Sequence, residues 1–280
     1  MKTYELINFG SSFLKDKRIL SSKIDSEIIL SYITGISRER LLIDEQEIQS
    51  DKVKEFKSLI LRRSKSEPIA YITKNKEFRS TDFFVDKHSL IPRPETELLI
   101  DPIISMFRKK SLFFLDVGIG SGCIIFSILK ELEHSKGIGI DKCKRTIFNA
   151  TKNLINLKLQ NRARLLHRPI SKILRYKFDL IVSNPPYIAR HQLKNLDHDI
   201  KYFEPKLALD GGNDGLDVMR KVIYKSRKIL KNNGILAIEI GNGQYKNVSQ
   251  ILKLNKFKEK FLINDYKDNI RCILSVLNHY

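Results

Sequence analysis

Features that mark several other protein classes are missing from this chain of 280 residues. Its three cysteines, Cys123, Cys143 and Cys272, are odd in number and widely spaced, which predicts a reducing cytoplasm and no disulfide framework. The six histidines form neither an H-x-x-x-H pattern nor a cluster with cysteine, so we expect no metal site. No run approaches the about 18 apolar residues that span a membrane. The first residues also lack the apolar block of a signal peptide.

The composition predicts a folded protein of about two domains, since domains usually hold about 100–200 residues. A hydrophobic content of 42% is enough for a sizeable core. The net charge of +19 favours contact with nucleic acid or with partners associated with it. The lysines are spread from end to end, however, and the chain is also rich in Ile and Asn. Composition therefore leaves open whether the charge is functional or a compositional bias.

Residues 1–73 predict a small helical domain. Apolar residues recur at helical spacing over Tyr4–Leu14, Asp25–Thr34 and Asp51–Lys65. Gly35 follows the second of these segments as a C-terminal stop signal. The first strand-like pattern of the chain is Pro68–Ile72.

Residues 74–90 predict a hairpin linker. Two short extended runs, Glu77–Arg79 and Phe83–Val85, are separated by polar residues, and we expect their phenylalanines to pack on the core. The segment Leu90–Glu97 leads into the second domain, residues 91–280. Its two prolines predict extended backbone, and its acidic residues then lie in the first turn of a helix, where they complement the helix dipole.

From Ser111 onwards, strand and helix patterns alternate, which predicts an α/β domain with a mostly parallel sheet and helices on both faces. The expected strands are Leu112–Val117, Gly137–Ile140, Arg164–His167, Phe178–Ser183, Ile235–Ile240 and an antiparallel pair, Phe261–Asp265 and Arg271–Leu277. The expected helices are Cys123–Leu132, Cys143–Leu157 and Asp217–Leu230, the last ending at a turn over Asn232–Gly234.

A glycine-rich loop, Asp116-Val117-Gly118-Ile119-Gly120-Ser121-Gly122, follows the first of these strands. Glycines let the backbone pass close to a ligand, but the G-x-G-x-G spacing matches the dinucleotide fingerprint poorly. Asp141 closes the second strand, where a carboxylate can accept both hydroxyls of a ribose. We interpret the loop and Asp141 as a site for a neutral nucleoside cofactor. The alternative is a tight strand-to-helix turn.

The tetrapeptide Asn184-Pro185-Pro186-Tyr187 follows the fourth strand. Two consecutive prolines hold φ near about −65°, have no N–H and push the preceding residue towards extended backbone. A side-chain amide, free carbonyls and an aromatic ring are thus presented on a stiff turn, which suits a planar NH2 group. A rigid loop with a packed tyrosine explains the four residues equally well.

The first and fourth strands are neighbours at the switch point of a doubly wound sheet, so both loops should open into one crevice. Together they resemble an S-adenosylmethionine-dependent methyltransferase that modifies planar nitrogens. Over nearly its whole length, the chain resembles the HemK/PrmC family of release-factor glutamine N5-methyltransferases. The motifs that carry this resemblance are Pro68–Ile72, Ile91–Glu97, Asp116–Gly122, Asn184–Tyr187, Phe203–Pro205, Ala208–Gly212 and Asp214–Gly215.

The resemblance implies a Rossmann-like class I methyltransferase domain with a seven-stranded, mostly parallel sheet, and a small N-terminal helical domain, residues 1–73, that recognises the substrate. It implies S-adenosyl-L-methionine as cofactor, S-adenosyl-L-homocysteine as product and class 1 peptide chain release factors as partners in the cytoplasm, with no membrane and no stable nucleic-acid partner. The implied cofactor contacts are Gly118, Ile119, Gly120, Ser121, Gly122, Asp141, Ile170 and Asn184. The implied substrate contacts are Asn184, Pro185, Pro186 and Tyr187, with Asn184, Pro185 and Tyr187 as the catalytic residues.

Two positions depart from the family pattern. Ile119 stands where threonine is usual, and Pro169 stands where the family usually has an acid that meets the adenine amino group. We expect weaker adenine binding, or a backbone carbonyl that substitutes for the acid. Methylation of a ribosomal-protein glutamine, or of an adenine N6 or guanine N2 amine in nucleic acid, fits the same tetrapeptide. A non-catalytic cofactor-binding module is a further alternative.

Overall fold

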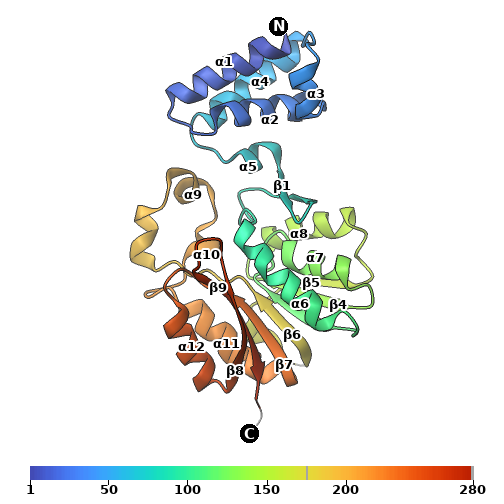
Figure 1. Cartoon of the computed structure of the whole chain (residues 1–280), viewed down its shortest axis with the longest axis vertical. Helices are drawn as coiled ribbons and strands as arrows, with labels where there is room; N and C mark the ends of the chain where they lie inside the picture. The colour runs from blue at the N-terminus through green and yellow to red at the C-terminus, as the bar shows by residue number, and fades with distance from the viewer. Residues whose placement is uncertain (175, 279–280) are drawn as a thin grey trace. The chain divides into compact units, whose positions relative to one another are not determined.

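The computed structural model describes residues 1–174 and 176–278 (Figure 1). The chain divides into two compact units. One unit comprises Met1–Asn75 with the short segment Asp197–Phe203, and the other comprises Lys76–Leu196 with Glu204–Tyr280. The domain boundaries given above, after residues 73 and 90, stay predictions.

The first unit is helical, as the apolar periodicity predicts. Its core is made of buried side chains that include Leu6, Leu30, Phe56 and Ile60. Gly35 ends the second helix with φ at 73°, which confirms it as the stop signal. The helices are α1 (Thr3–Asp16), α2 (Ser22–Thr34), α3 (Arg38–Ile43), α4 (Ser50–Arg63), α5 (Ile69–Thr73) and, in the short segment, α9 (His198–Phe203).

The strand-like pattern at Pro68–Ile72 is wrong as a strand, because Ile69–Thr73 forms the one-turn helix α5. The carbonyl of Pro68 accepts the N–H groups of Tyr71 and Ile72 at 2.9 and 3.2 Å, which closes the turn locally. A run of five mostly apolar residues carries too little periodicity to separate a buried helical turn from a strand.

The predicted hairpin is confirmed as a two-stranded sheet of β1 (Asn75–Phe78) and β2 (Thr81–Phe84). Arg79 and Ser80 both have positive φ, at 49° and 52°, as a two-residue hairpin turn of primed type requires. The rings of Phe78 and Phe83 are buried and pack edge to face, with centroids 6.2 Å apart. They belong to the hydrophobic core of the second unit, as expected.

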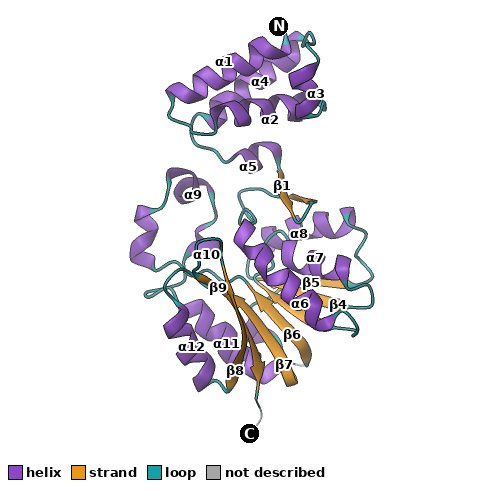
Figure 2. Cartoon of the chain, in the orientation of Figure 1, coloured by secondary structure: helices purple, strands orange, loops and turns teal. Residues whose placement is uncertain are grey.

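The second unit contains a sheet of seven strands in the order β5-β4-β3-β6-β7-β9-β8 (Figure 2). The pairs from β5 to β7 are parallel, and β9 is antiparallel to both β7 and β8. The strands are β3 (Phe113–Val117), β4 (Lys136–Asp141), β5 (Ala163–His167), β6 (Phe178–Ser183), β7 (Leu230–Glu239), β8 (Phe257–Asn264) and β9 (Ile270–Leu277). The α/β class and the mostly parallel sheet are therefore confirmed.

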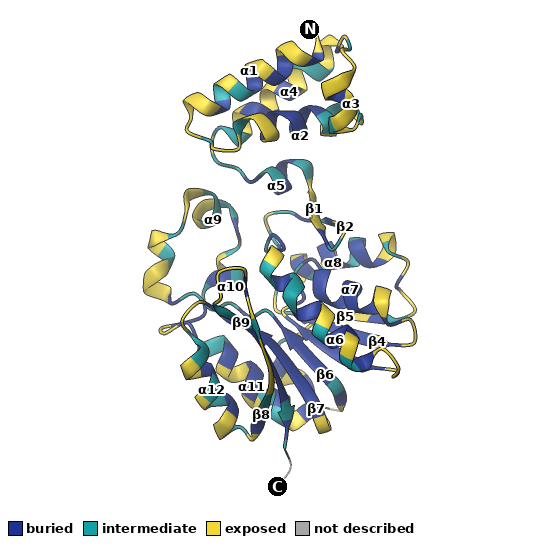
Figure 3. Cartoon of the chain, viewed as in Figure 1, coloured by how far each residue is buried: buried dark blue, intermediate teal, exposed yellow. Residues whose placement is uncertain are grey.

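Helices cover both faces of this sheet, and alternate residues of its central strands enter one of two separate cores. On β6, Leu180 and Val182 join the core under α6, α7 and α8, whereas Ile181 joins the core under α11 and α12. Figure 3 shows the resulting buried central strands between half-exposed helices, whereas the edge strand β8 is largely exposed. The helices are η1 (Pro94–Leu99), α6 (Ile100–Phe107), α7 (Cys123–Glu131), α8 (Lys144–Asn156), η2 (Ile170–Lys172), η3 (Arg190–Asn195), α10 (Lys206–Leu209), α11 (Asp217–Ile229) and α12 (Tyr245–Leu254).

Two features near the C-terminal half differ from the sequence-based expectation. The turn expected over Asn232–Gly234 lies inside β7, which begins at Leu230 and changes its register against β6 there. Asn233 has φ at 59°, and these residues form a bulge within β7 instead of the turn that was expected to precede the strand. The helix α12 was not predicted. Among the described residues, no helix is long and apolar enough to cross a membrane.

The strand order reverses between β3 and β6. From β3 the chain adds β4 and β5 on one side, and it then returns to place β6 on the other side of β3. The two strands pair in parallel, with Val117 opposite Ser183. The segments that follow their carboxyl ends are the glycine-rich loop and the tetrapeptide, so the predicted topological switch point is confirmed.

Gly10 generates a stability prediction for the helical unit. A Cβ on Gly10 would lie 2.5 Å from Ser26 Oγ and 2.8 Å from Phe56 Cζ, where α1 meets α2 and α4. We expect Gly10→Ala to destabilise the protein by about 1–3 kcal/mol through overpacking, although alanine favours a helix by about 1 kcal/mol. Urea unfolding measures this, with the exposed Ser12→Ala on α1 as the control that should be neutral or stabilising. A Gly10→Ala protein at least as stable as the wild type would contradict the close packing.

Candidate active site

The glycine-rich loop joins β3 to α7 and is tied to the end of β4. The N–H groups of Gly118 and Ile119 both donate to the carbonyl of Ile140, at 2.9 and 3.0 Å. Gly118 and Gly120 have φ at 78° and 57°, and a Cβ on either would have no heavy atom nearer than 4.0 Å. The loop therefore exposes backbone to open space on this side, which leaves room for a ligand.

Gly122 is required for a different reason. It caps the N-terminus of α7 with φ at 87°, and a Cβ there would lie 2.1 Å from Cε2 of Phe126. The third glycine of the loop thus lets the helix pack closely against the turn. Its neighbour Ser121 is buried and accepts a hydrogen bond at its carbonyl from Asn153 Nδ2 at 2.8 Å.

Asp141 ends β4 beside this loop. Its carboxylate accepts hydrogen bonds from the backbone N–H of Cys143 at 2.9 Å and, more weakly, of Gly120 at 3.5 Å. Burial raises the pKa of the Asp141 carboxyl, and the backbone N–H groups oppose that rise. Because the residue is only half-buried, its carboxylate can still accept hydrogen bonds from a ligand.

Of the two departures from the family pattern, the structure explains Ile119 and leaves Pro169 without a structural explanation. Ile119 points into the core, and a Cβ on Gly139 of β4 would lie 2.2 Å from its Cδ1, so a glycine makes room for it. Pro169 precedes η2 in extended conformation. Ile170, the first residue of η2, is buried in the same core as Ile138 and Ile140. Contact of Ile170 with an adenine stays a prediction.

Asn184 lies across the switch point from the glycine loop, and its carbonyl oxygen would be 4.0 Å from a Cβ on Gly118. Its side-chain Nδ2 donates to Thr96 Oγ1 at 3.0 Å, and Thr96 Oγ1 donates in turn to Glu239 Oε2 at 2.6 Å. Ser183, the residue before Asn184, donates its hydroxyl to the carbonyl of Val117 at 2.7 Å. The two loops are therefore brought together, as the sequence predicts.

Tyr187 is held by the turn that follows β7. Its carbonyl accepts a hydrogen bond from Gln244 Nε2 at 2.8 Å, and Gln244 Oε1 accepts from the N–H of Gly241 at 2.9 Å. A Cβ on Gly215 would lie 2.4 Å from the same Tyr187 carbonyl, so only glycine fits there. Burial raises the pKa of the Tyr187 phenol to about 12, with the charge of Glu239 adding to the effect, so the phenol stays protonated at neutral pH.

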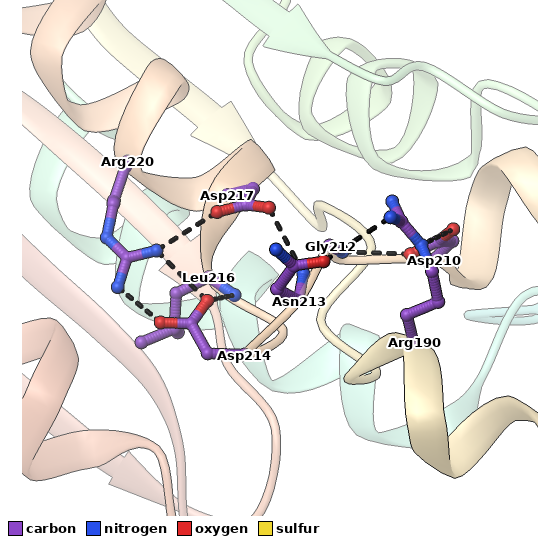
Figure 4. Close-up of polar contacts among 8 residues, drawn as sticks. All are labelled: Arg190, Asp210, Gly212, Asn213, Asp214, Leu216, Asp217 and Arg220. Carbon is purple, nitrogen blue, oxygen red and sulfur yellow. Dashed lines mark hydrogen bonds and ion pairs between the residues drawn. The ribbon is translucent and has the colours of Figure 1, made fainter.

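The segment Asp210–Asp217 supports the chain just beyond Tyr187. The carbonyl of Ile188 accepts from the N–H of Gly211 at 2.9 Å, and Arg190 pairs with Asp210 at 3.1 Å. Within the segment, Asp210 accepts from the N–H of Gly212, and Asp214 pairs with Arg220 (Figure 4). These carboxylates are engaged in shaping the turn and supporting the tetrapeptide.

The segment that includes Arg93, Thr96 and Glu97 binds four other parts of the unit. Arg93 forms an ion pair with the buried Glu204 at 2.5 Å. Thr96 contacts Asn184 and Glu239, and the carboxylate of Glu97 accepts the N–H of Arg79 at 3.0 Å. The motif Ile91–Glu97 thus connects the hairpin, the tetrapeptide and the end of β7. The ion pair gives Glu204, in the motif Phe203–Pro205, a structural role.

Sequence reasoning missed Thr96 and Glu239 as members of the site. Glu239 carried a usable signal, because it is a charged residue in the apolar run Ile235–Ile240. Burial raises the pKa of Glu239 to about 7, while the hydrogen bond from Thr96 and the charge of Arg271 act in the opposite direction. Thr96 lies in the motif Ile91–Glu97, but as an ordinary polar residue near the start of η1 it gave no indication of its partners.

Two family models match the chain. The PrmC N-terminal domain model matches residues 5–73, and a methyltransferase domain model matches residues 108–274. The release factor glutamine methyltransferase of Caulobacter vibrioides is 35% identical over 268 residues, which cover 95% of this chain and 93% of that protein. The protein of the same name from Clostridium acetobutylicum is 35% identical over 283 residues, 99% of each chain.

Solved structures support the fold. A methyltransferase from Pyrococcus furiosus superposes with a TM-score of 0.56 at 16% identity, covering 80% of this chain and 98% of that one. At this identity, the likeness shows the methyltransferase fold alone.

Asp116 generates a prediction about pH. It is buried at the end of β3, where one carboxylate oxygen accepts the N–H of Ile125 at 3.2 Å and the other has no hydrogen-bond partner among residues 1–174 and 176–278. Burial raises its pKa from 3.8 to about 7, and the N–H of Ile125 opposes the rise. Between pH 3.8 and about 7 the folded protein holds this proton more tightly than the unfolded chain does. The free energy of unfolding therefore falls as the pH rises through that range. The loss due to Asp116 is at most about 4 kcal/mol.

We expect Asp116→Asn to remove the part of the pH-dependent fall in stability that is due to Asp116. The amide can still accept the N–H of Ile125, and it carries no charge at any pH. Urea unfolding at pH 5 and pH 8 measures the difference for wild type and variant. The exposed Asp268→Asn is the control and should behave as the wild type. The same pH dependence in Asp116→Asn and wild type would show that burial of this carboxyl has no such effect.

Proposed function

Since the chain belongs to the family of release factor glutamine methyltransferases, we propose that it transfers a methyl group from S-adenosyl-L-methionine to a glutamine of class 1 peptide chain release factors. The acceptor is the side-chain amide nitrogen in their Gly-Gly-Gln motif. The observation that carries this proposal is the position of Asn184 opposite the glycine loop, with its Nδ2 bound to Thr96. Its Oδ1 is thereby left as an acceptor for the N–H of another amide.

The residues of the crevice fit the proposed cofactor. Open space over Gly118 and Gly120 admits a ligand against the backbone. The Asp141 carboxylate can accept the two ribose hydroxyls while its backbone bonds to Cys143 and Gly120 keep it in place. When bound, the cofactor supplies an electrophilic methyl group on a sulfonium. Product release would leave S-adenosyl-L-homocysteine on the same residues.

The chemistry required of the protein is positioning. The lone pair of an amide nitrogen is delocalised into its carbonyl, and its N–H is far too weak an acid for a general base to remove at neutral pH. We propose that Asn184 Oδ1 and the Pro185 carbonyl each accept one N–H of the glutamine, which turns the nitrogen towards the methyl group. The methylated nitrogen would be strongly acidic and would lose one of these two protons to water, which leaves a neutral N-methyl amide. Holding reactants in such a geometry supplies about 7–11 kcal/mol of a barrier in favourable cases.

Tyr187 would place its ring beside the bound amide. Pro186 would complete the substrate contacts by keeping the turn stiff. The protonated phenol of Tyr187 adds no charge to the crevice at neutral pH. The proposed site thus binds a neutral side chain with neutral groups, as an amide substrate requires.

Asn184→Ala tests the acceptor role. We expect it to lower methyl transfer at least about 100-fold, by analogy with the loss of a single preorganised group in other active sites. Its affinity for S-adenosylhomocysteine should stay within about threefold of wild type. Transfer of labelled methyl to purified release factor and calorimetry measure the two quantities. The exposed Asn156→Ala, at the end of α8, is the matched control and should retain full activity.

The acceptor itself is tested by offering the wild type release factors, ribosomes and nucleic acid in separate reactions. Label on the glutamine of the Gly-Gly-Gln motif supports the proposal. Label on a ribosomal protein or on a base amine would replace it with one of the two alternative activities. Near-normal turnover by Asn184→Ala would refute the mechanism.

Asp141→Asn tests the cofactor half of the site. The amide oxygen can keep the stronger bond from the Cys143 N–H, while the weak bond from Gly120 is lost and binding of both ribose hydroxyls is weakened. We expect about tenfold lower affinity for S-adenosylhomocysteine in calorimetry, in line with the loss of hydrogen bonds to a charged group. Asn184→Ala serves as the comparison, since it should impair transfer and spare cofactor binding. Unchanged affinity in Asp141→Asn would remove Asp141 from the cofactor site.

A further inference from the structure

The three side chains Asn184, Thr96 and Glu239 form a continuous hydrogen-bonded chain. Asn184 Nδ2 donates to Thr96 Oγ1 at 3.0 Å, and Thr96 Oγ1 donates to Glu239 Oε2 at 2.6 Å. They come from three parts of the sequence: the loop after β6, the helix η1 and the end of β7. Thr96 and Glu239 are 2% and 1% exposed, so water does not compete for these bonds.

The protons available to these three side chains fix which group donates in each hydrogen bond. An ionised carboxylate can only accept hydrogen bonds, so Thr96 must use its single hydroxyl proton to donate to Glu239. The hydroxyl oxygen of Thr96 then has only lone pairs to offer Asn184. It can bind the NH2 end of the Asn184 amide, and it repels the carbonyl end.

The direction matters because the two ends of an asparagine amide have nearly the same size and shape. Packing alone does not select which end faces the crevice, whereas a hydrogen-bond partner does. A flipped amide would present its own N–H groups to the N–H groups of the substrate glutamine, and no hydrogen bond could form. The proposed reaction therefore needs one of the two orientations.

From these contacts we infer that Thr96 and Glu239 are positioning residues: they hold the Asn184 amide with its oxygen towards the acceptor nitrogen. This inference rests on the proposed function, since it assigns the orientation that the glutamine amide requires. Neither residue touches the reacting atoms in this role, and both act through Asn184.

The burial of Glu239 supports such a role. An isolated carboxylate at this depth is costly, and it persists in a protein when its position serves a purpose. On β9, Arg271 lies near enough to offset part of the cost. On η1, Glu95 adds a repulsive charge. A hydrophobic residue at the end of β7 would avoid the free-energy cost of burying a charge, but it would not determine the direction of the Thr96 hydroxyl.

The test compares Thr96→Val with Thr96→Ser in the full-length chain at pH 8.5, above the raised pKa of Glu239. Valine keeps the shape of threonine and removes the hydroxyl, whereas serine keeps the hydroxyl. We expect Thr96→Val to lower kcat for transfer to release factor by about tenfold or more, as misplacement of a reacting group does. The affinity for S-adenosylhomocysteine should stay within about twofold of wild type, and Thr96→Ser should restore most of kcat.

Glu239→Gln provides a second variant that keeps the shape and the hydrogen bond to Thr96. Its amide can donate as well as accept, so the Thr96 hydroxyl is no longer forced to point away from Asn184. We expect a lower kcat with unchanged cofactor affinity. This variant decides the question if Thr96→Val does not fold. Thr151→Val removes a threonine hydroxyl on α8 that bonds only its own helix, and it should leave kcat unchanged.

The outcomes separate the two levels of the proposal. A wild-type chain that methylates no glutamine defeats the proposed function, and the inference falls with it. An active wild type whose kcat is unaffected by Thr96→Val and Glu239→Gln overturns the inference alone. Failure of Thr96→Ser to recover activity would also overturn it, because the hydroxyl would then not be the essential group.

Discussion

The parallel pairing of β3 with β6 brings together two loops that are about 60 residues apart in the chain. Val117 lies opposite Ser183, and the Ser183 hydroxyl adds a hydrogen bond to the Val117 carbonyl at 2.7 Å. In a parallel pair both strands end at the same edge, so the next residues of both must emerge there. The glycine loop and Asn184 face each other because of this pairing. Thr96 and Glu239 then form their hydrogen bonds at the same edge of the sheet.

Around that edge the structure buries several carboxyl groups, and each has its own set of hydrogen-bond partners. Asp116, Asp141 and Glu239 lie at the ends of β3, β4 and β7, and burial raises the pKa of all three. Such groups lower the stability of a folded protein at neutral pH. Their accumulation at one end of the sheet is the pattern expected where stability is given up for function. Elsewhere the same unit places apolar side chains on both faces of the sheet.

Much of the fold could be predicted because the evidence for it is local. Apolar periodicity marked α1, α2 and α4, and the alternation of patterns from Ser111 marked the parallel sheet. Prediction was wrong at Pro68–Ile72, where the run was too short to show a period, and at Asn232–Gly234, where turn-forming residues are accommodated as a bulge. The individual roles of Ile170, Pro185 and the other predicted site residues stay predictions.

The sequence by itself determined that two loops with distinct chemistry, Asp116–Gly122 and Asn184–Tyr187, end neighbouring strands of a parallel sheet. That conclusion needs only residue types and their order. Only the tertiary structure decided which groups hold Asn184, because Thr96 and Glu239 are 88 and 143 residues from their partners in the chain. Hydrogen bonds between residues so far apart leave no periodicity or spacing in the sequence. They depend on distances and directions that exist only once the sheet, the helix η1 and the tetrapeptide have packed together.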